Sequence, residues 1–333
     1  MEDSIEDIYD TLKRSAMISQ SGGGLGINLQ DIRNEGSKIS TGGRSSGIFP
    51  VCKQIQALTD YVSQERKRRG SYAVNIEVYN RDIEKVLKMR LNTGSSHNQC
   101  LDLFSCIVLP DIFLERLRQP NSDWTLFCTT DVPHLKNLFG TAFTDAYIAC
   151  ESEIYKYPSA VKIKTHKLWK LLCKSIIETG APYLISKSNM NRSVQSRLIN
   201  NQALTMTNLC AEIMEFAGRD CSSGERHTAV CNLATLKLDR FLDEKNQFNF
   251  KLFDETVKLV VKNLNHTIDC TAYPEQSTKT SNLALRPLGI GVQALGDLFM
   301  KMKLPFESEE ARNLNFHISE QLYFSALSAS LEL

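Results

Sequence analysis

The sequence predicts an α/β fold in which most strands pair in parallel. Short apolar runs of alternating polarity are separated by longer stretches whose apolar residues recur every three or four positions. Strands and helices therefore alternate along the chain, as they do in parallel sheets covered by helices. At 333 residues, the chain is long enough to bury a large core or to form two domains.

The first half of the chain repeats this alternation several times. Ser4 precedes an amphipathic stretch and is a favoured N-cap residue, so a helix should begin there and end at the glycines after Ser21. Alternating apolar residues then predict a strand from Leu25 to Leu29. Further helices are predicted over residues 48–61, 83–87, 132–151 and 164–179, and further strands over residues 72–76, 104–109, 124–128 and 183–185.

The second half opens with two cysteine-bearing segments and then becomes mainly helical. Both segments, residues 206–215 and 229–236, are expected to be short strands, and the polar stretch 220–227 between them is the best linker candidate. A run of glycines in residues 286–297 should open an apolar helix. The helices predicted in this half cover residues 252–268, 291–302 and 308–331.

Composition excludes several classes of protein. A net charge of +1 provides no electrostatic attraction for nucleic acid or for an anionic membrane. No apolar run approaches about 18 residues and no signal peptide opens the chain, so we expect a cytoplasmic protein without a membrane anchor. The ten cysteines have no regular spacing, and the six histidines are scattered, so neither a disulfide scaffold nor a metal site is expected.

The segment Asn208-Leu-Cys-Ala-Glu212 is the most suggestive of chemistry. In an extended strand, Asn208, Cys210 and Glu212 would share one face, while Leu209 and Ile213 would anchor the other face in a core. A thiol between an amide and a carboxylate can act by acid–base, nucleophilic or redox chemistry. By itself, however, this pattern is more often that of an ordinary strand with a buried structural cysteine.

Several motifs together resemble one family, the large subunit of class I ribonucleotide reductase of the eukaryotic and large-DNA-virus type. Its catalytic segment reads Asn-Leu-Cys-x-Glu-Ile and its second redox segment reads Ala-Val-Cys-Asn-Leu-Ala, which match residues 208–213 and 229–234. A later family segment, Arg-Pro-Ile-Gly-Ile-Gly-Val-Gln-Gly-Leu, resembles residues 286–295. Further resemblances extend from end to end, at residues 3–13, 23–27, 178–183 and 304–312.

This resemblance implies a ten-stranded α/β barrel, incomplete here, with the catalytic cysteine on a finger loop through its centre. The implied reaction is the radical-based reduction of ribonucleoside diphosphates to 2′-deoxyribonucleoside diphosphates, which supplies DNA precursors. Cys210 matches the thiyl-forming cysteine, and Glu212 matches the base that removes the 3′-hydroxyl proton. Asn208 matches the amide that hydrogen-bonds the substrate, and Cys231 matches one half of the redox pair.

The glycines of residues 22–26 have a different implied role. A dinucleotide-binding loop follows a strand and opens a helix, whereas a helix is predicted before these glycines and a strand after them, so we reject that interpretation. In the resembling family, these glycines let the backbone approach the substrate, and Gly24 is the closest match. Leu209 and Asn208 are expected to complete the substrate contacts.

A nucleoside triphosphate effector is expected to bind at Asp3, Ser4, Ile5 and Arg33. The N-terminus of the first helix offers free N–H groups to phosphate, and an arginine adds a strong donor. Two departures from the family pattern suggest that effector control is eroded. Gln20 stands where the family has lysine, and the loop at residues 62–70 has lost two glycines, an aspartate and a proline.

The resemblance also implies partners. No cofactor is expected to bind this chain, because a metal-containing small subunit supplies the radical and thioredoxin or glutaredoxin supplies electrons. A homodimer is expected. We interpret residues 1–333 as the central part of the barrel domain, without the N-terminal effector cone and the C-terminal barrel segments, and expect it to be inactive alone. The alternative is a catalytically incomplete homologue that acts as a protein-binding module.

Overall fold

The computed structural model describes residues 1–333 except residues 41, 63–68, 94–95 and 193–201. The chain divides into two compact units, Met1–Ala229 and Val230–Leu333. Most of the altered loop at residues 62–70 lies outside the described residues, so its effect on effector control stays a prediction.

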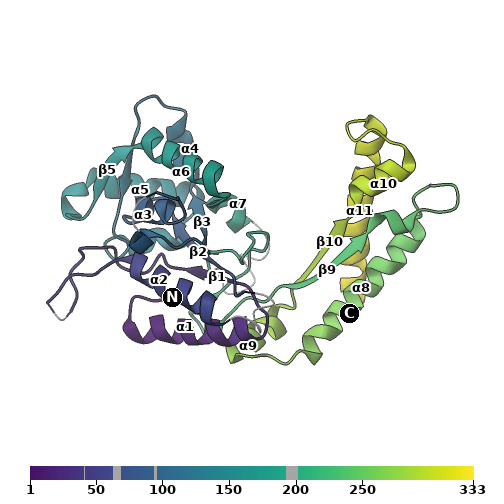
Figure 1. Ribbon diagram of the computed structural model, residues 1–333, viewed down its shortest axis with the longest axis horizontal. Coiled ribbons are helices and arrows are strands. Elements are labelled where there is room, and N and C mark those ends of the chain that lie inside the picture. The colour runs from purple at the N-terminus through teal and green to yellow at the C-terminus, as the bar shows by residue number, and fades with distance from the viewer. Residues whose placement is uncertain (41, 63–68, 94–95, 193–201) are drawn as a thin grey trace. The chain divides into compact units, whose positions relative to one another are not determined.

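A four-stranded parallel sheet is the centre of the first unit (Figure 1). Its strands, in spatial order, are β1 (Leu25–Asn28), β2 (Tyr72–Glu77), β3 (Phe104–Leu109) and β6 (Tyr183–Ser186). The predicted α/β class and the parallel pairing are confirmed. The closure of these strands into a ten-stranded barrel stays a prediction.

The remaining elements of this unit surround the sheet. Two short strands, β4 (Asp123–Leu126) and β5 (Val161–Lys164), pair antiparallel away from it. The α-helices are α1 (Ile5–Gln20), α2 (Ile48–Tyr61), α3 (Ile83–Lys88), α4 (Asp111–Leu117), α5 (Gly140–Ser152), α6 (Thr165–Thr179) and α7 (Lys187–Arg192). Short 3₁₀ helices are η1 (Ser96–Asn98), η2 (Pro133–Asn137) and η3 (Ile154–Lys156).

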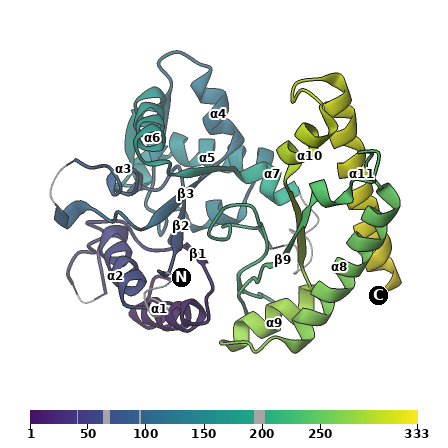
Figure 2. The same cartoon turned by 45° about the vertical axis from the view of Figure 1, so that its right-hand side comes forward.

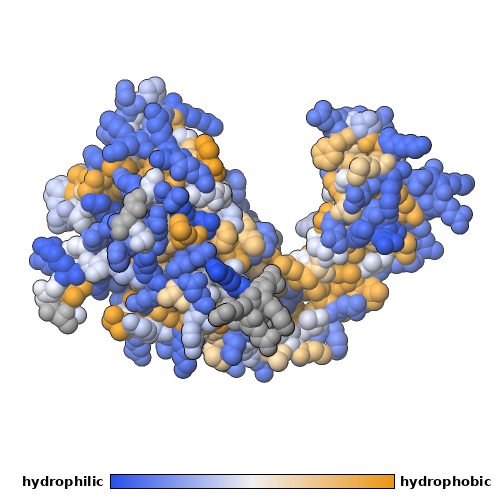
Figure 3. All heavy atoms as spheres, viewed as in Figure 1, coloured by the Kyte–Doolittle hydropathy of each residue, from blue (hydrophilic) through white to orange (hydrophobic). Residues whose placement is uncertain are grey.

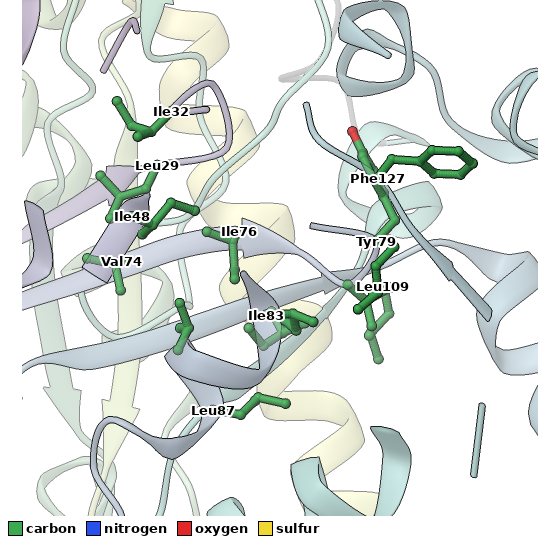
Figure 4. Packing of buried hydrophobic residues seen from close by; sticks show 14 of the residues in the cluster. Leu29, Ile32, Ile48, Val74, Ile76, Tyr79, Ile83, Leu87, Leu109 and Phe127 are labelled. Atoms are coloured by element: carbon green, nitrogen blue, oxygen red, sulfur yellow. The ribbon is translucent and has the colours of Figure 1, made fainter. Parts of the chain in front are cut away.

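The two faces of the sheet differ in chemistry. On one face, alternate residues of β2 such as Val74 and Ile76 are fully buried in the main apolar core. Figure 4 shows Ile48 of α2 and Ile83 of α3 beside them. The intervening positions point to the other face, because successive strand side chains alternate. The apolar core therefore occupies only the helix-covered side of the sheet.

The other face carries a row of polar and aromatic side chains, one from each strand. The strand register aligns Asn28 of β1 with Asn75 of β2, then Cys106 of β3 and Tyr183 of β6. Asn75 is completely buried, so this face is covered although it is polar. We call these four residues the polar row.

A buried ion pair lies on the same face. The Lys187 ammonium group at the start of α7 lies 2.9 and 2.7 Å from the two carboxylate oxygens of Glu77, and both side chains are 1% exposed. Lys187 also donates to the backbone oxygen of Leu135 at 2.8 Å. Burial raises the pKa of Glu77 and lowers the pKa of Lys187, while the attraction between the two groups opposes both shifts. The pair joins β2 to α7.

The second unit contains a two-stranded parallel sheet of β9 (Asn232–Lys237) and β10 (Leu288–Gln293). Its core includes Leu236, Phe253 and Ile318. Figures 1 and 2 show α8 and α11 side by side. The helices are α8 (Phe250–Cys270), α9 (Gln276–Leu285), α10 (Leu295–Met302) and α11 (Glu309–Glu332), and η5 (Leu238–Phe241) follows β9.

One prediction for this unit was wrong in part. The helix predicted over residues 291–302 is present only over Leu295–Met302, whereas residues 288–293 form β10 and pair with β9 along its whole length. The helix begins only at Leu295, after Ala294 in the left-handed region at φ 63°. Glycine lowers helix propensity, and a neighbouring strand offers the backbone groups of this segment their partners.

Candidate active site

Residues 202–217, the Cys210 loop, run as an irregular segment over the polar face of the first sheet. Three buried asparagines hold the loop. Asn28 donates through Nδ2 to the backbone oxygen of Thr205 at 2.8 Å, and Oδ1 of Asn75 accepts from the backbone N–H and the hydroxyl of Thr207, both at 3.2 Å. Asn191 exchanges two hydrogen bonds with the backbone of Leu204. Side-chain amides thus replace a strand partner for this loop.

Two glycines of β1 and the turn before it let the loop approach closely. A Cβ atom on Gly26 would lie 1.9 Å from the backbone oxygen of Thr207, and one on Gly24 would lie 2.4 Å from Cδ2 of Leu209. A larger residue at Gly26 would push the loop backbone away, whereas one at Gly24 would require the Leu209 side chain to shift. The structure therefore brings Gly24 and Leu209 into contact with each other, and their role in substrate binding stays a prediction.

The loop crosses the polar row in the order of the strands. After contacting Asn75, the hydroxyl of Thr207 reaches the sulfur of Cys106 at 3.8 Å. The next position in the row is Tyr183, whose ring stacks on Phe104 with centroids 6.2 Å apart. Burial raises the pKa of Tyr183.

The predicted strand at Asn208–Glu212 was wrong, because these residues form a tight turn. Oδ1 of Asn208 accepts from the backbone N–H of Ile213 at 3.1 Å, and the Asn208 N–H donates to the Ile213 oxygen at 3.2 Å. Ala211 adopts φ 65°. Asparagine often closes turns through its side chain, which competes with an extended conformation. Cys210 and Glu212 are consequently exposed at the tip, and Leu209 and Ile213 are only half-buried.

Sequence reasoning missed the residues that hold the Cys210 loop, namely Asn28, Asn75 and Asn191. A signal was present, since Asn75 interrupts the otherwise apolar run of β2 and is a residue depleted in strands. Its burial requires polar partners, and the Cys210 loop supplies them.

The predicted effector residues gather at the N-terminus of α1. Ser4 caps the helix by accepting from the backbone N–H of Asp7 at 3.1 Å. The Arg33 guanidinium lies 2.6 Å from the carboxylate of Asp3, and the Arg33 N–H donates to the same group. Ile5 is exposed. Asp3, Ser4 and Arg33 are thus brought together, with Arg33 paired to Asp3.

The polar stretch 220–227 is a folded hairpin, so the linker prediction was wrong. Strands β7 (Gly218–Arg219) and β8 (Arg226–His227) pair antiparallel, and the carboxylate of Asp220 accepts hydrogen bonds within the turn. Arg226 forms an ion pair with Asp7 in the first turn of α1, and Arg219 lies 3.3 Å from Glu2. Opposite charges fix the hairpin to the helix.

Cys231 belongs to the second unit. It is half-buried and directly precedes β9.

Residues 1–333 match the family model for the ribonucleotide reductase barrel domain. The chain belongs to the class I ribonucleotide reductase large-subunit family. The family predicted from the sequence motifs is therefore confirmed.

Curated ribonucleotide reductase subunits align with the whole chain. It is 41% identical to the ribonucleoside-diphosphate reductase large chain of Encephalitozoon cuniculi, over 100% of this chain and 42% of that protein. It is 39% identical to the large subunit of Caenorhabditis elegans, over 100% of this chain and 41% of that protein. The large subunit of Variola virus is also 39% identical, with 42% of its length covered. The chain spans about two fifths of the length of these relatives.

The electrostatics around Cys210 disfavour its thiolate form. Partial burial raises the pKa of Cys210, and the neighbouring Glu212 carboxylate raises it further. The thiol is therefore protonated at neutral pH. Nucleophilic attack and thiol–disulfide exchange need the thiolate, whereas hydrogen-atom transfer uses the intact S–H bond.

We expect the Glu212→Gln substitution to accelerate alkylation of Cys210. Removal of the carboxylate lowers the pKa of the thiol and raises the thiolate fraction at pH 8. The acceleration should reach up to roughly five-fold, because exposed charge pairs contribute at most about 1 kcal/mol. Iodoacetamide labelling followed by peptide mass spectrometry measures the rate. Glu225→Gln in the exposed hairpin turn is the control, and an equal rate in both variants would contradict the prediction.

The described residues of the chain contain neither a candidate metal site nor a candidate membrane span. Among its described residues, no group of three or more His, Cys, Asp or Glu side chains is arranged to hold a metal ion. Within the same residues, every helix is too short or too polar to cross a membrane. The face of the first unit seen in Figure 3 is largely hydrophilic, with hydrophobic residues scattered among hydrophilic ones.

Proposed function

We propose that this chain carries the substrate-reducing site of a ribonucleoside-diphosphate reductase, which converts ribonucleoside diphosphates into 2′-deoxyribonucleoside diphosphates. The observation that carries this proposal is the Cys210 turn, which presents a protonated thiol beside a carboxylate. Close packing against glycines and hydrogen bonds from buried asparagines hold the loop that bears this turn. Membership of the ribonucleotide reductase family supports it.

The chemistry follows from the difficulty of displacing hydroxide from an unactivated carbon. A thiyl radical at Cys210 removes the 3′ hydrogen atom, and Glu212 accepts the 3′-hydroxyl proton. The C2′–O bond is thereby weakened, and the 2′-hydroxyl leaves as water. Two thiols, one of them Cys231, supply two electrons and two protons while they close to a disulfide. One proton leaves with the 2′-hydroxyl in water, the other is delivered to C2′, and Glu212 returns its proton to the 3′ oxygen. Cys210 finally returns a hydrogen atom to C3′ and becomes a thiyl again.

Asn208 has a divided role in this proposal. Its Oδ1 accepts from Ile213 and closes the turn. We therefore assign the contact with the substrate hydroxyls to its Nδ2 group, which is a donor only. Gly24 and Leu209 form the adjoining surface for the substrate.

The remaining roles concern molecules outside this chain. A metal-containing small subunit supplies the radical, thioredoxin or glutaredoxin re-reduces the disulfide, and a second large subunit completes a homodimer. A nucleoside triphosphate effector binds at Asp3, Ser4, Ile5 and Arg33. The capped N-terminus of α1 supports this assignment, because its N–H groups and helix dipole suit phosphate. For the effector to bind, the Arg33 guanidinium must give up part of its contact with the Asp3 carboxylate and donate to the phosphate instead.

The test is a chimeric enzyme in which residues 1–333 replace the matching segment of the Caenorhabditis elegans large subunit. With its small subunit and a dithiol reductant, the chimera should form deoxycytidine diphosphate from cytidine diphosphate. Cys210→Ala should abolish product, whereas Cys221→Ala, in the exposed hairpin, should not. The isolated chain should form none. A folded chimera that binds the small subunit but forms no product would favour the alternative of a protein-binding module.

A further inference from the structure

A network of side-chain amides, in which Asn282 is buried, adjoins Cys231. Asn232, the next residue, opens β9 and donates through Nδ2 to Oδ1 of Asn282 at 2.7 Å and to the backbone oxygen of Pro287 at 2.8 Å. Nδ2 of Asn282 lies 3.3 Å from Oδ1 of Asn232 in return. The two side chains form a reciprocal pair between β9 and α9.

The network extends from this pair to a second helix. Nδ2 of Asn282 also donates to the hydroxyl of Tyr273 at 2.8 Å, and that hydroxyl donates to the backbone oxygen of Ile268 in α8 at 2.6 Å. Asn282 is 0% exposed. Asn232 is therefore linked to α9 and to Pro287 directly before β10, and through Asn282 and Tyr273 to α8.

The two ends of β9 are held by different forces. Leu236 and the adjoining Leu238 belong to the apolar core of the unit, whereas Leu233 is 53% exposed. The end of β9 that carries Cys231 is therefore anchored by hydrogen bonds. Buried amides are costly unless their donors and acceptors are paired, so an apolar contact would fill this space more simply. The directional bonds of an amide pair fix the orientation of Asn232, which apolar packing does not do.

We infer that Asn282 is a positioning residue for Cys231, acting through its reciprocal bonds with Asn232. The importance of this positioning for the reaction rests on the proposed function, in which Cys231 is a redox thiol. Disulfide formation requires narrow ranges of distance and dihedral angle, so a thiol on an unanchored strand end would meet its partner less often. The anchoring itself does not depend on the reaction.

Alkylation of Cys231 tests the inference in the intact 333-residue chain. Asn282→Ala removes both halves of the amide pair and should raise the iodoacetamide labelling rate of Cys231 roughly three- to ten-fold, the effect of losing about one net hydrogen bond. Asn282→Asp keeps an oxygen that can accept from Nδ2 of Asn232, so its effect should be smaller. Asn315→Ala, on the exposed side of α11, is the matched control and should leave the rate unchanged.

Several readouts separate positioning from general loosening. The same experiment measures the labelling rates of three other cysteines, which should stay constant. These are Cys210 and Cys221 in the first unit and Cys270 at the end of α8. An equal rise at Cys270 and Cys231 would overturn the inference, as would an unchanged Cys231 rate in a folded Asn282→Ala variant. If Asn282→Ala fails to fold, the ordering of wild type, Asn282→Asp and Asn315→Ala decides. Failure of the chimera to form product would contradict the proposed function and leave this result unaffected.

Discussion

Replacing Lys187 by methionine should destabilise the Met1–Ala229 unit by about 3–5 kcal/mol, because removal of one partner of a buried ion pair leaves an uncompensated charge. Glu77 would remain on the polar face with its side chain 1% exposed and without its ammonium partner. Urea unfolding followed by tryptophan fluorescence measures the change, since Trp124 and Trp169 both lie in this unit.

The matched control is Lys88→Met. Lys88 pairs with Glu84 on the exposed surface of α3 at 3.0 Å, and such pairs contribute roughly 0.5 kcal/mol or less. The double variant Glu77→Leu, Lys187→Met removes both charges and should recover most of the loss. Equal losses for Lys187→Met and Lys88→Met would contradict the expectation.

The loss in Lys187→Met should also depend on pH. Burial is the main cause of the raised pKa of Glu77, and the variant lacks the ammonium group that opposes this shift. A carboxyl with a raised folded-state pKa binds its proton more tightly in the folded state than in the unfolded state. The loss should therefore be small below the ordinary glutamate value of 4.5, grow as pH rises toward the folded-state pKa, and be constant above it.

The Gly26→Ala substitution should displace the Cys210 loop. It should lower the free energy of unfolding of the first unit by about 1–3 kcal/mol, the usual cost of overpacking. The added methyl group would meet the backbone of Thr207 and of Asn208, at 1.9 and 3.1 Å, and neither β1 nor the anchored loop can yield by a side-chain rotation alone. Displacement of the loop would also strain the bonds between Thr207 and Asn75.

Urea unfolding and the Cys210 alkylation rate together check this prediction, and the rate should rise as the turn loses its support. The control is Gly296→Ala in α10, where an added Cβ meets nothing within 4 Å. Alanine has the higher helix propensity, so this variant should be unchanged or more stable by up to about 1 kcal/mol. An unchanged unfolding midpoint in Gly26→Ala would show that the loop can move without cost.

Elements with a strong apolar period could be predicted from the sequence alone. The helix that Ser4 caps and the buried strands β2 and β3 are where the pattern placed them. Helix α9 was missed because its buried residues, Ser277, Thr278, Ser281 and Asn282, are all polar and leave no apolar period. β10 was misassigned because its partner β9 lies more than fifty residues earlier.

The candidate site follows the same division. Motifs identified Cys210, Glu212 and Asn208, because residue types carry the chemistry. Their turn could not be predicted, because it depends on contacts with distant residues. Asn28 holds the loop across 177 positions of sequence and Asn75 across 132 positions. A local pattern contains no information on such contacts.

Because of the polar row, the two faces of each strand in the first sheet contact different parts of the protein. A change at Val74 is felt by the helices behind the sheet, and a change at its neighbour Asn75 is felt by the loop in front. Alternate positions of one strand therefore have different roles. One set of side chains stabilises the core, and the other set supports the loop that carries Cys210. Substitutions on the helix-covered face can therefore change the core without changing the face that contacts the Cys210 loop. The sequence of such a core can diverge widely while the chemistry that it supports is retained.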